Sequence, residues 1–134
     1  MALETLNLTK NQQTVLDILE SASEPLKAYT ILFDIQKKGI KSPLQVYRAL
    51  DKLIEIGKVH KIESRNSYVA CKHEGCNAKT STSFLICENC DSVTELTANN
   101  LFSYFSKQAE KNSFNYKKHN LEIFGLCENC KLKN

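Results

Sequence analysis

The residues best suited to chemistry are six cysteines, all of which follow residue 70. Four of them form two Cys-x-x-Cys pairs, Cys87 with Cys90 and Cys127 with Cys130. This spacing lets both sulfurs of a turn reach one ion, and two such turns supply the four thiolates of a closed structural zinc site. Each pair encloses the same dipeptide, Glu-Asn, which indicates one structural role used twice. The pattern therefore predicts that the four cysteines share a structural zinc ion.

Two other interpretations of the cysteine pairs stay open. A disulfide framework would require export, and the first ten residues lack the basic and apolar regions of a secretory signal. We therefore expect a reducing, cytoplasmic location, where structural disulfides are rare. A thiol-disulfide oxidoreductase would require a cysteine of low pKa, which the neighbouring Glu88 and Glu128 do nothing to stabilise. No set of nucleophile, base and orienting residue is apparent, so we predict a protein that is not an enzyme.

Other residues could bind a second metal ion. They are His60, Cys71, His73, Cys76, Glu95 and His119. Thiolate, imidazole and carboxylate ligands together suit zinc better than magnesium or manganese. Ligands drawn from both halves of the chain would let the metal fix the angle between them, which is the minimum for a metal-controlled switch. His60 and His119 alternate with apolar residues, so simple packing is the alternative for each.

Three helices and a hairpin are expected before the first cysteine. The apolar spacing and the turn residues predict helices over 9–22 and 26–38, a third helix from Ser42 that ends at Gly57, and strands over 59–63 and 68–71. Thr9 with Gln12, and Ser42 with Gln45, have the spacing of a capping box. Three helices followed by a two-stranded hairpin is the order of a winged helix-turn-helix, which we place at residues 1–70.

The second half is expected to be a small α/β unit. Strands are predicted over 83–87, 92–96 and 116–124, with a helix from 97 to about 112. The fold class is therefore α+β. We predict a linker with regulatory metal ligands at 71–82 and a dimerisation and metal-binding domain at 83–134.

The third helix has the properties of a DNA-reading helix. Val46, Ala49, Leu50 and Leu53 form its apolar stripe, so Tyr47 and Arg48 point elsewhere. The candidate contacts to bases or phosphates are Lys41, Ser42, Gln45, Tyr47, Arg48 and, at the hairpin tip, Arg65. The net charge is only +3, which excludes a general polyanion binder and favours a dimer that doubles the phosphate contacts. No run of 18 apolar residues indicates a membrane span.

Several local motifs together resemble the ferric uptake regulator family and, within it, the zinc uptake regulator branch. They include Leu8-Thr-Lys-Asn-Gln-Gln, Val46-Tyr-Arg-Ala-Leu-Asp51, Asn66-Ser-Tyr-Val-Ala-Cys71, Phe84-Leu-Ile-Cys-Glu-Asn-Cys90 and His119-Asn-Leu-Glu-Ile-Phe-Gly-Leu-Cys-Glu-Asn-Cys130. The resemblance implies a homodimeric repressor that binds palindromic operators of zinc-uptake genes when it is loaded with one structural and one regulatory zinc ion per chain. It also implies that Tyr29 joins Arg48 among the DNA contacts.

The resemblance also implies a ligand set for the regulatory zinc ion. The matching residues are His60, Cys71 and Glu95, with a linker histidine as the fourth ligand. That histidine is absent at its usual offset, and Cys76 takes its place, with His73 as the alternative. A histidine-rich stretch that the family usually carries before Cys87 is absent too, which disfavours the branches that respond to iron or peroxide. Regulators of iron, manganese or peroxide stay as alternatives.

Overall fold

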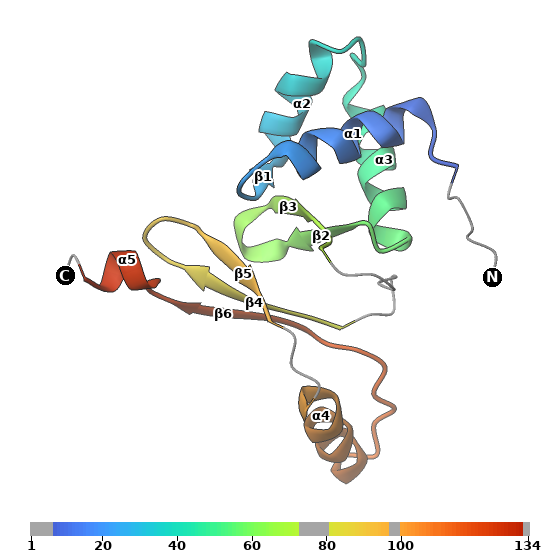
Figure 1. The fold of residues 1–134 in the computed structure, drawn as a ribbon. Helices are drawn as coiled ribbons and strands as arrows, with labels where there is room; N and C mark the ends of the chain where they lie inside the picture. The colour runs from blue at the N-terminus through green and yellow to red at the C-terminus, as the bar shows by residue number, and fades with distance from the viewer. Residues whose placement is uncertain (1–6, 73–80, 97–99, 133–134) are drawn as a thin grey trace. The chain divides into compact units, whose positions relative to one another are not determined.

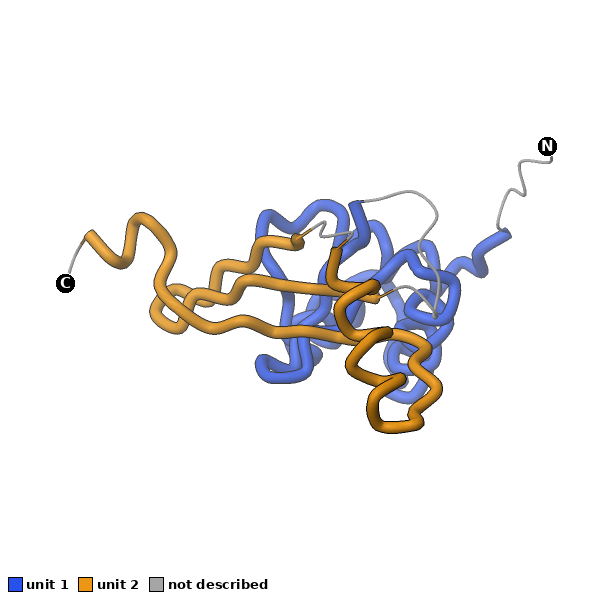
Figure 2. Tube along the Cα trace, turned by 90° about the horizontal axis from the view of Figure 1, so that it is seen from below, with its two compact units in different colours: residues 1–78 blue, residues 79–134 orange. Residues whose placement is uncertain are grey.

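A computed structural model describes residues 7–72, 81–96 and 100–132 (Figure 1). The chain divides into two compact units, residues 1–78 and 79–134, which Figure 2 colours separately. The boundary falls inside the segment 71–82 that the sequence assigns to a linker. Within the described residues, no helix is both long and apolar enough to cross a bilayer.

Unit 1 consists of helices and a small sheet in the order that the sequence predicts, with one strand added. Its elements are α1 (Lys10–Ser21), β1 (Leu26–Lys27), α2 (Ala28–Gln36), α3 (Pro43–Glu55), β2 (Val59–Ile62), η1 (Glu63–Arg65) and β3 (Ser67–Ala70). The strands are antiparallel in the order β1-β3-β2. Helices α1, α2 and α3 and the hairpin share one apolar core, in which Val15, Ile31, Ile35, Leu53 and Val59 are fully buried.

Helix α1 begins with the capping box that the sequence predicts. The backbone N–H of Gln12 donates to Thr9 Oγ1 at 3.2 Å, and the backbone N–H of Thr9 donates to Gln12 Oε1 at 3.0 Å. The two bonds satisfy donors that an uncapped helix would leave to water.

Helix α2 is shorter than predicted, because its first two expected residues form a strand. Leu26 pairs with Tyr68 and Lys27 pairs with Ser67, so the helix begins only at Ala28. A two-residue strand has no periodicity of its own, and its partner lies some forty residues away, so this pairing could not be predicted locally. The helix also ends two residues earlier than predicted, at Gln36, and Gly39 follows with a φ of +97° that suits a residue without Cβ.

Helix α3 has the predicted bounds and the predicted buried stripe, but not the predicted capping box. Ser42 is the N-cap residue and Pro43 occupies the first turn, yet the side chain of Ser42 makes no capping bond. The backbone N–H of Gln45 donates instead to the Ser42 carbonyl at 3.1 Å. Since that donor is already satisfied, the Ser42 hydroxyl is not needed to cap the helix.

Unit 2 is built around a three-stranded sheet in the order β5-β4-β6. Its elements are β4 (Thr82–Cys87), β5 (Val93–Glu95), α4 (Asn100–Lys111), β6 (Asn120–Gly125) and α5 (Glu128–Lys131). β5 is antiparallel to β4, whereas β6 is parallel to it. Strand β6 starts at Asn120, four residues later than the sequence predicts. The rings of Tyr116 and His119 pack against Phe105 of α4, and the His119 carbonyl accepts a hydrogen bond from the backbone N–H of Thr82 at 3.0 Å.

Candidate metal centre and nucleic-acid interface

The parallel pairing of β4 and β6 brings the two cysteine pairs to the same end of the sheet. Cys87 is the last residue of β4 and lies opposite Gly125, the last residue of β6. Parallel strands end at the same edge, so the turn that carries Cys90 and the segment that carries Cys127 meet there. The backbone N–H of Glu88 donates to the Gly125 carbonyl at 2.8 Å and extends the pairing into the turn.

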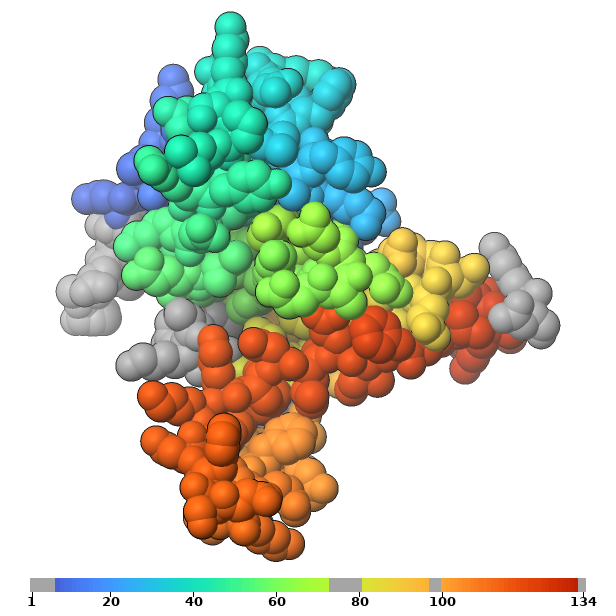
Figure 3. All heavy atoms as spheres, turned by 180° about the vertical axis from the view of Figure 1, so that it is seen from behind, coloured from blue at the N-terminus to red at the C-terminus, as the bar shows by residue number. Residues whose placement is uncertain are grey.

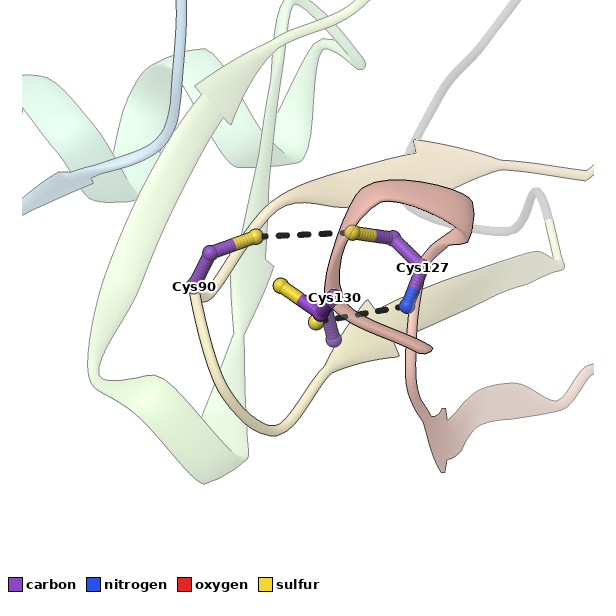
Figure 4. Close-up of side chains that lie close together, drawn as sticks. Cys90, Cys127 and Cys130 are labelled. Atoms are coloured by element: carbon purple, nitrogen blue, oxygen red, sulfur yellow. Dashed lines mark hydrogen bonds between the residues drawn. The ribbon is translucent and has the colours of Figure 1, made fainter. Parts of the chain in front are cut away.

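The four sulfur atoms have the spacing that a tetrahedral zinc site requires. The Sγ atoms of Cys87, Cys90, Cys127 and Cys130 all lie within 4.8 Å of one another. Those of Cys90 and Cys127 are 3.8 Å apart (Figure 4). Four sulfurs at about 2.3 Å from a central zinc ion would be about 3.8 Å from each other, so the side chains already fit the ion.

Hydrogen-bond donors around Cys87 favour its thiolate. The backbone N–H of Cys127 donates to Cys87 Sγ at 3.4 Å. With further backbone N–H groups of Cys90 and Asn89, this bond lowers the pKa of Cys87 to about 6. A thiolate is the form that binds zinc, so Cys87 is prepared as a ligand.

The environment of Cys130 is different. The amide of Asn89 donates to Cys130 Sγ at 3.2 Å and lowers its pKa, but burial and the neighbouring sulfurs, Cys127 first, raise the pKa to about 11. Four thiolates repel one another, and a divalent cation among them removes the repulsion. None of the five described cysteines forms a disulfide. A redox pair uses two sulfurs, whereas four converge here.

The predicted regulatory ligands are distributed over both units. His60 lies on β2, Cys71 directly follows β3, and Glu95 ends β5 in unit 2. Cys76 and His73 lie outside the described residues. In unit 1, His60 pairs with Val69, and Cys71 donates its backbone N–H to Lys58 at 2.8 Å. Because side chains alternate along a strand, His60 and Cys71 share one face of the hairpin as diagonal neighbours.

His119 has the surroundings of a packed residue. Its Nδ1 is 2.6 Å from the Tyr116 hydroxyl and its Nε2 is 3.4 Å from Ser83 Oγ. Its ring also makes an edge contact with that of Phe105, with an interplanar angle of 61° and 5.1 Å between the centroids. Burial lowers its pKa. Both ring nitrogens have a polar neighbour, and the ring lies between Phe105 of α4 and Ser83 of β4.

The candidate DNA contacts lie on the outer surfaces of α2, α3 and the hairpin tip. Tyr29 is 70 % exposed and Tyr47 is 40 % exposed. Figure 3 shows α2 and α3 next to each other at the surface of unit 1. Of the other candidates, Lys41, Gln45 and Arg48 are exposed, while Ser42 and Arg65 are half-buried. The structure therefore leaves the amino-terminal turns of α3 accessible to a partner.

Two residues with functional potential were missed in the sequence. Leu44 is 57 % exposed in the first turn of α3, one turn before Arg48. Its position outside the apolar stripe could have identified it as a surface residue. Asn89 was noticed only as part of a repeated dipeptide, and nothing in the sequence shows that its amide reaches Cys130.

Comparison with known proteins identifies the family. The model of the ferric uptake regulator family matches residues 4–124. The zinc uptake regulation protein of Escherichia coli (strain K12) is 35 % identical over 130 residues, which cover 96 % of this chain and 75 % of that protein.

Two solved structures are similar in fold and sequence. The crystal structure of holo XcZur has a TM-score of 0.85 and 38 % identity, covering 96 % of this chain and 89 % of that one. A zinc uptake regulator complexed with zinc and DNA has a TM-score of 0.87 and 31 % identity, covering 97 % and 87 %. The chain therefore belongs to the ferric uptake regulator family and, within it, to the zinc uptake regulator branch.

Proposed function

We propose that the protein is a zinc-responsive transcriptional repressor that binds palindromic operators of zinc-uptake genes as a zinc-loaded homodimer. The observation that carries this proposal is the convergence of four cysteine sulfurs within 4.8 Å in a chain whose relatives include a zinc uptake regulator complexed with zinc and DNA. The family is one of regulators, so no reaction is assigned. We expect such a DNA-binding regulator to act in the cytoplasm.

The DNA-binding role belongs to residues 1–70 and depends on α3. The exposed side chains of Gln45, Tyr47 and Arg48 occupy the turns of a recognition helix that enter a major groove. Arg48 can donate two hydrogen bonds to a guanine, and Leu44 can contact a thymine methyl group. Tyr29, Lys41, Ser42 and Arg65 complete the set as phosphate or groove contacts.

The homodimer belongs to residues 83–134, whose apolar residues are only partly covered within one chain. Leu85, Ile123, Phe124 and Leu126 are all more than two-fifths exposed, and α4 has no fully buried residue. Among the described residues β6 pairs on one side only, so it is an edge strand. A second copy would cover this surface and bring two recognition helices to one operator.

The regulatory zinc ion would be bound by His60, Cys71, Cys76 and Glu95, with His73 as the alternative to Cys76. The support is the shared face of His60 and Cys71 on the hairpin, and a donor set of imidazole, thiolate and carboxylate that suits zinc. When bound, zinc would supply a cation that thiolate, imidazole and carboxylate ligands can share. His60 and Cys71 would hold the hairpin side of that centre, and Glu95 the β5 side. Together with the structural site, this gives two zinc ions per chain.

Arg48→Ala is expected to weaken zinc-dependent operator binding by about 1–3 kcal/mol, because it removes a bidentate base contact. Fluorescence anisotropy with a labelled operator in saturating zinc measures the loss. Lys107→Ala, which removes an exposed cation of α4, is the control and should leave affinity within about twofold. Equal losses in both variants would argue against a recognition role for α3.

Titration with different metals tests the zinc response itself. The metal-stripped protein should recover operator binding with zinc at lower free concentrations than with iron(II) or manganese(II). Recovery by iron or manganese alone would replace the zinc assignment with one of the rival metals, while DNA binding by α3 would still stand.

A further inference from the structure

The same tetrapeptide, Cys-Glu-Asn-Cys, occurs twice in the zinc site, but its two asparagines have different roles. Asn89 and Asn129 occupy equivalent positions in the motif, and both are exposed. The Nδ2 atom of Asn89 donates to Cys130 Sγ at 3.2 Å. In the part of the chain that the structure describes, Asn129 has no corresponding bond to a cysteine sulfur. Identical sequence has therefore produced unequal contacts.

The inequality follows from the backbone around each motif. Residues 87–90 form the turn between β4 and β5, in which the backbone N–H of Asp91 donates to the Cys87 carbonyl at 3.0 Å and Asp91 has a φ of +61°. The second motif forms the start of α5, where Lys131 donates to the Cys127 carbonyl at 2.9 Å. A tight turn and a helix start hold the two asparagine side chains in different settings.

The bond from Asn89 matters because four thiolates carry more negative charge than one zinc ion neutralises. A hydrogen bond donated to a thiolate offsets this charge and fixes the position of the sulfur. Cys87 receives such a bond from the backbone of Cys127, and Cys130 receives one from the side chain of Asn89. Each bond crosses from one motif to the other. Only the second depends on a side chain, so only the second can be removed by substitution.

We infer that Asn89 is a positioning residue of the structural zinc site, which holds Cys130 against the ion and joins the two cysteine motifs, whereas Asn129 is not. This inference rests on the zinc assignment of the four cysteines. It concerns how tightly and how long the ion is held, and not the response to regulatory zinc.

Two matched pairs of variants in the full-length protein test the inference. Asn89→Ala and Asn129→Ala each remove the side-chain amide. Asn89→Asp and Asn129→Asp keep the shape of the side chain and add one negative charge at each position. Competition with a chromogenic chelator measures the affinity of the tighter-bound zinc ion and its rate of release. We expect each Asn89 variant to weaken zinc binding by about 10- to 100-fold. The Asn129 variants should stay within about threefold of the wild type and each other.

A spectroscopic readout separates positioning from general loss of structure. With cobalt(II) in the site, the sulfur-to-cobalt charge-transfer band should move to lower energy in Asn89→Ala, because the Cys130 thiolate loses a hydrogen-bond donor. The band should not move in Asn129→Ala. Equal effects at both asparagines, or unchanged affinity and spectra at Asn89, would overturn the inference. A wild-type protein that binds no zinc at the four cysteines would instead overturn the zinc assignment on which the inference rests.

Discussion

Cys87→Ser is expected to unfold unit 2 while leaving unit 1 folded. The variant loses a zinc ligand that also ends the central strand β4 and receives the Cys127 hydrogen bond. The apparent free energy of structural zinc binding in small domains is about 10–16 kcal/mol. The total stability of a typical domain is only about 5–15 kcal/mol. Among the described residues of unit 2 few apolar side chains are fully buried, chiefly Phe84 and Ile86, so this core is too small to replace the ion.

Hydrogen exchange by mass spectrometry measures this outcome unit by unit. Peptides from 82–96 and 120–131 should lose protection in Cys87→Ser, while peptides from α1 and α3 keep theirs. Zinc analysis should show loss of the tightly held ion. The control is Cys71→Ser, which removes a cysteine outside the four-sulfur cluster. Full protection and full zinc content in Cys87→Ser would show that the cluster does not hold the fold together.

Cys71→Ser should abolish the zinc response of DNA binding without unfolding the protein. Cys71 directly follows β3, is half-buried, and lies outside the cluster that stabilises unit 2. Its loss should reduce zinc from two ions per chain to one. In saturating zinc, the variant should bind the operator only as tightly as wild-type protein without regulatory zinc. The loss in affinity should be about 5- to 150-fold, which is the usual size of the coupling between an effector site and a ligand site.

The zinc content and oligomeric state of the variant decide this second prediction. A folded dimer with one zinc ion per chain and no metal response supports separate sites. An unfolded or monomeric Cys71→Ser protein would mean that the two sites were assigned wrongly. Parallel zinc analysis of Cys76→Ala and His73→Ala identifies the fourth ligand. Only the variant that lacks the true ligand should lose the second zinc ion.

Most of the fold could be predicted from local patterns. The stripe of Val46, Ala49, Leu50 and Leu53 is buried as predicted, and the Thr9 capping box is present. The pairing of Leu26 with Tyr68 could not be predicted, because a two-residue strand depends on a partner far away in sequence. The late start of β6 was not predicted either. The apolar alternation suggested a longer strand, whereas the rings of Tyr116 and His119 pack against Phe105.

The candidate site was predictable to different extents. Cysteine spacing alone indicated the four-sulfur cluster, since few arrangements of two Cys-x-x-Cys pairs satisfy a tetrahedral ion. The position of Arg48 on the exposed side of its helix followed from periodicity. The bond from Asn89 to Cys130 did not, because it depends on the backbone of a turn and on a helix 41 residues away in sequence. Spacing reveals which residues bind a metal, but not which residues support them.

The parallel pairing of β4 and β6 also affects how the protein folds. Its partners are far apart in the chain, as with Thr82 and Asn120, which are separated by 38 residues. Contacts of such separation form slowly, because the loop between them must close before any pairing energy is gained. The cysteine motifs lie at the ends of the same two strands, so an ion captured by both motifs closes that loop in advance. A zinc ion bound early by both motifs would therefore be expected to speed the pairing of β4 with β6 and to shorten the time for which their strand edges are exposed.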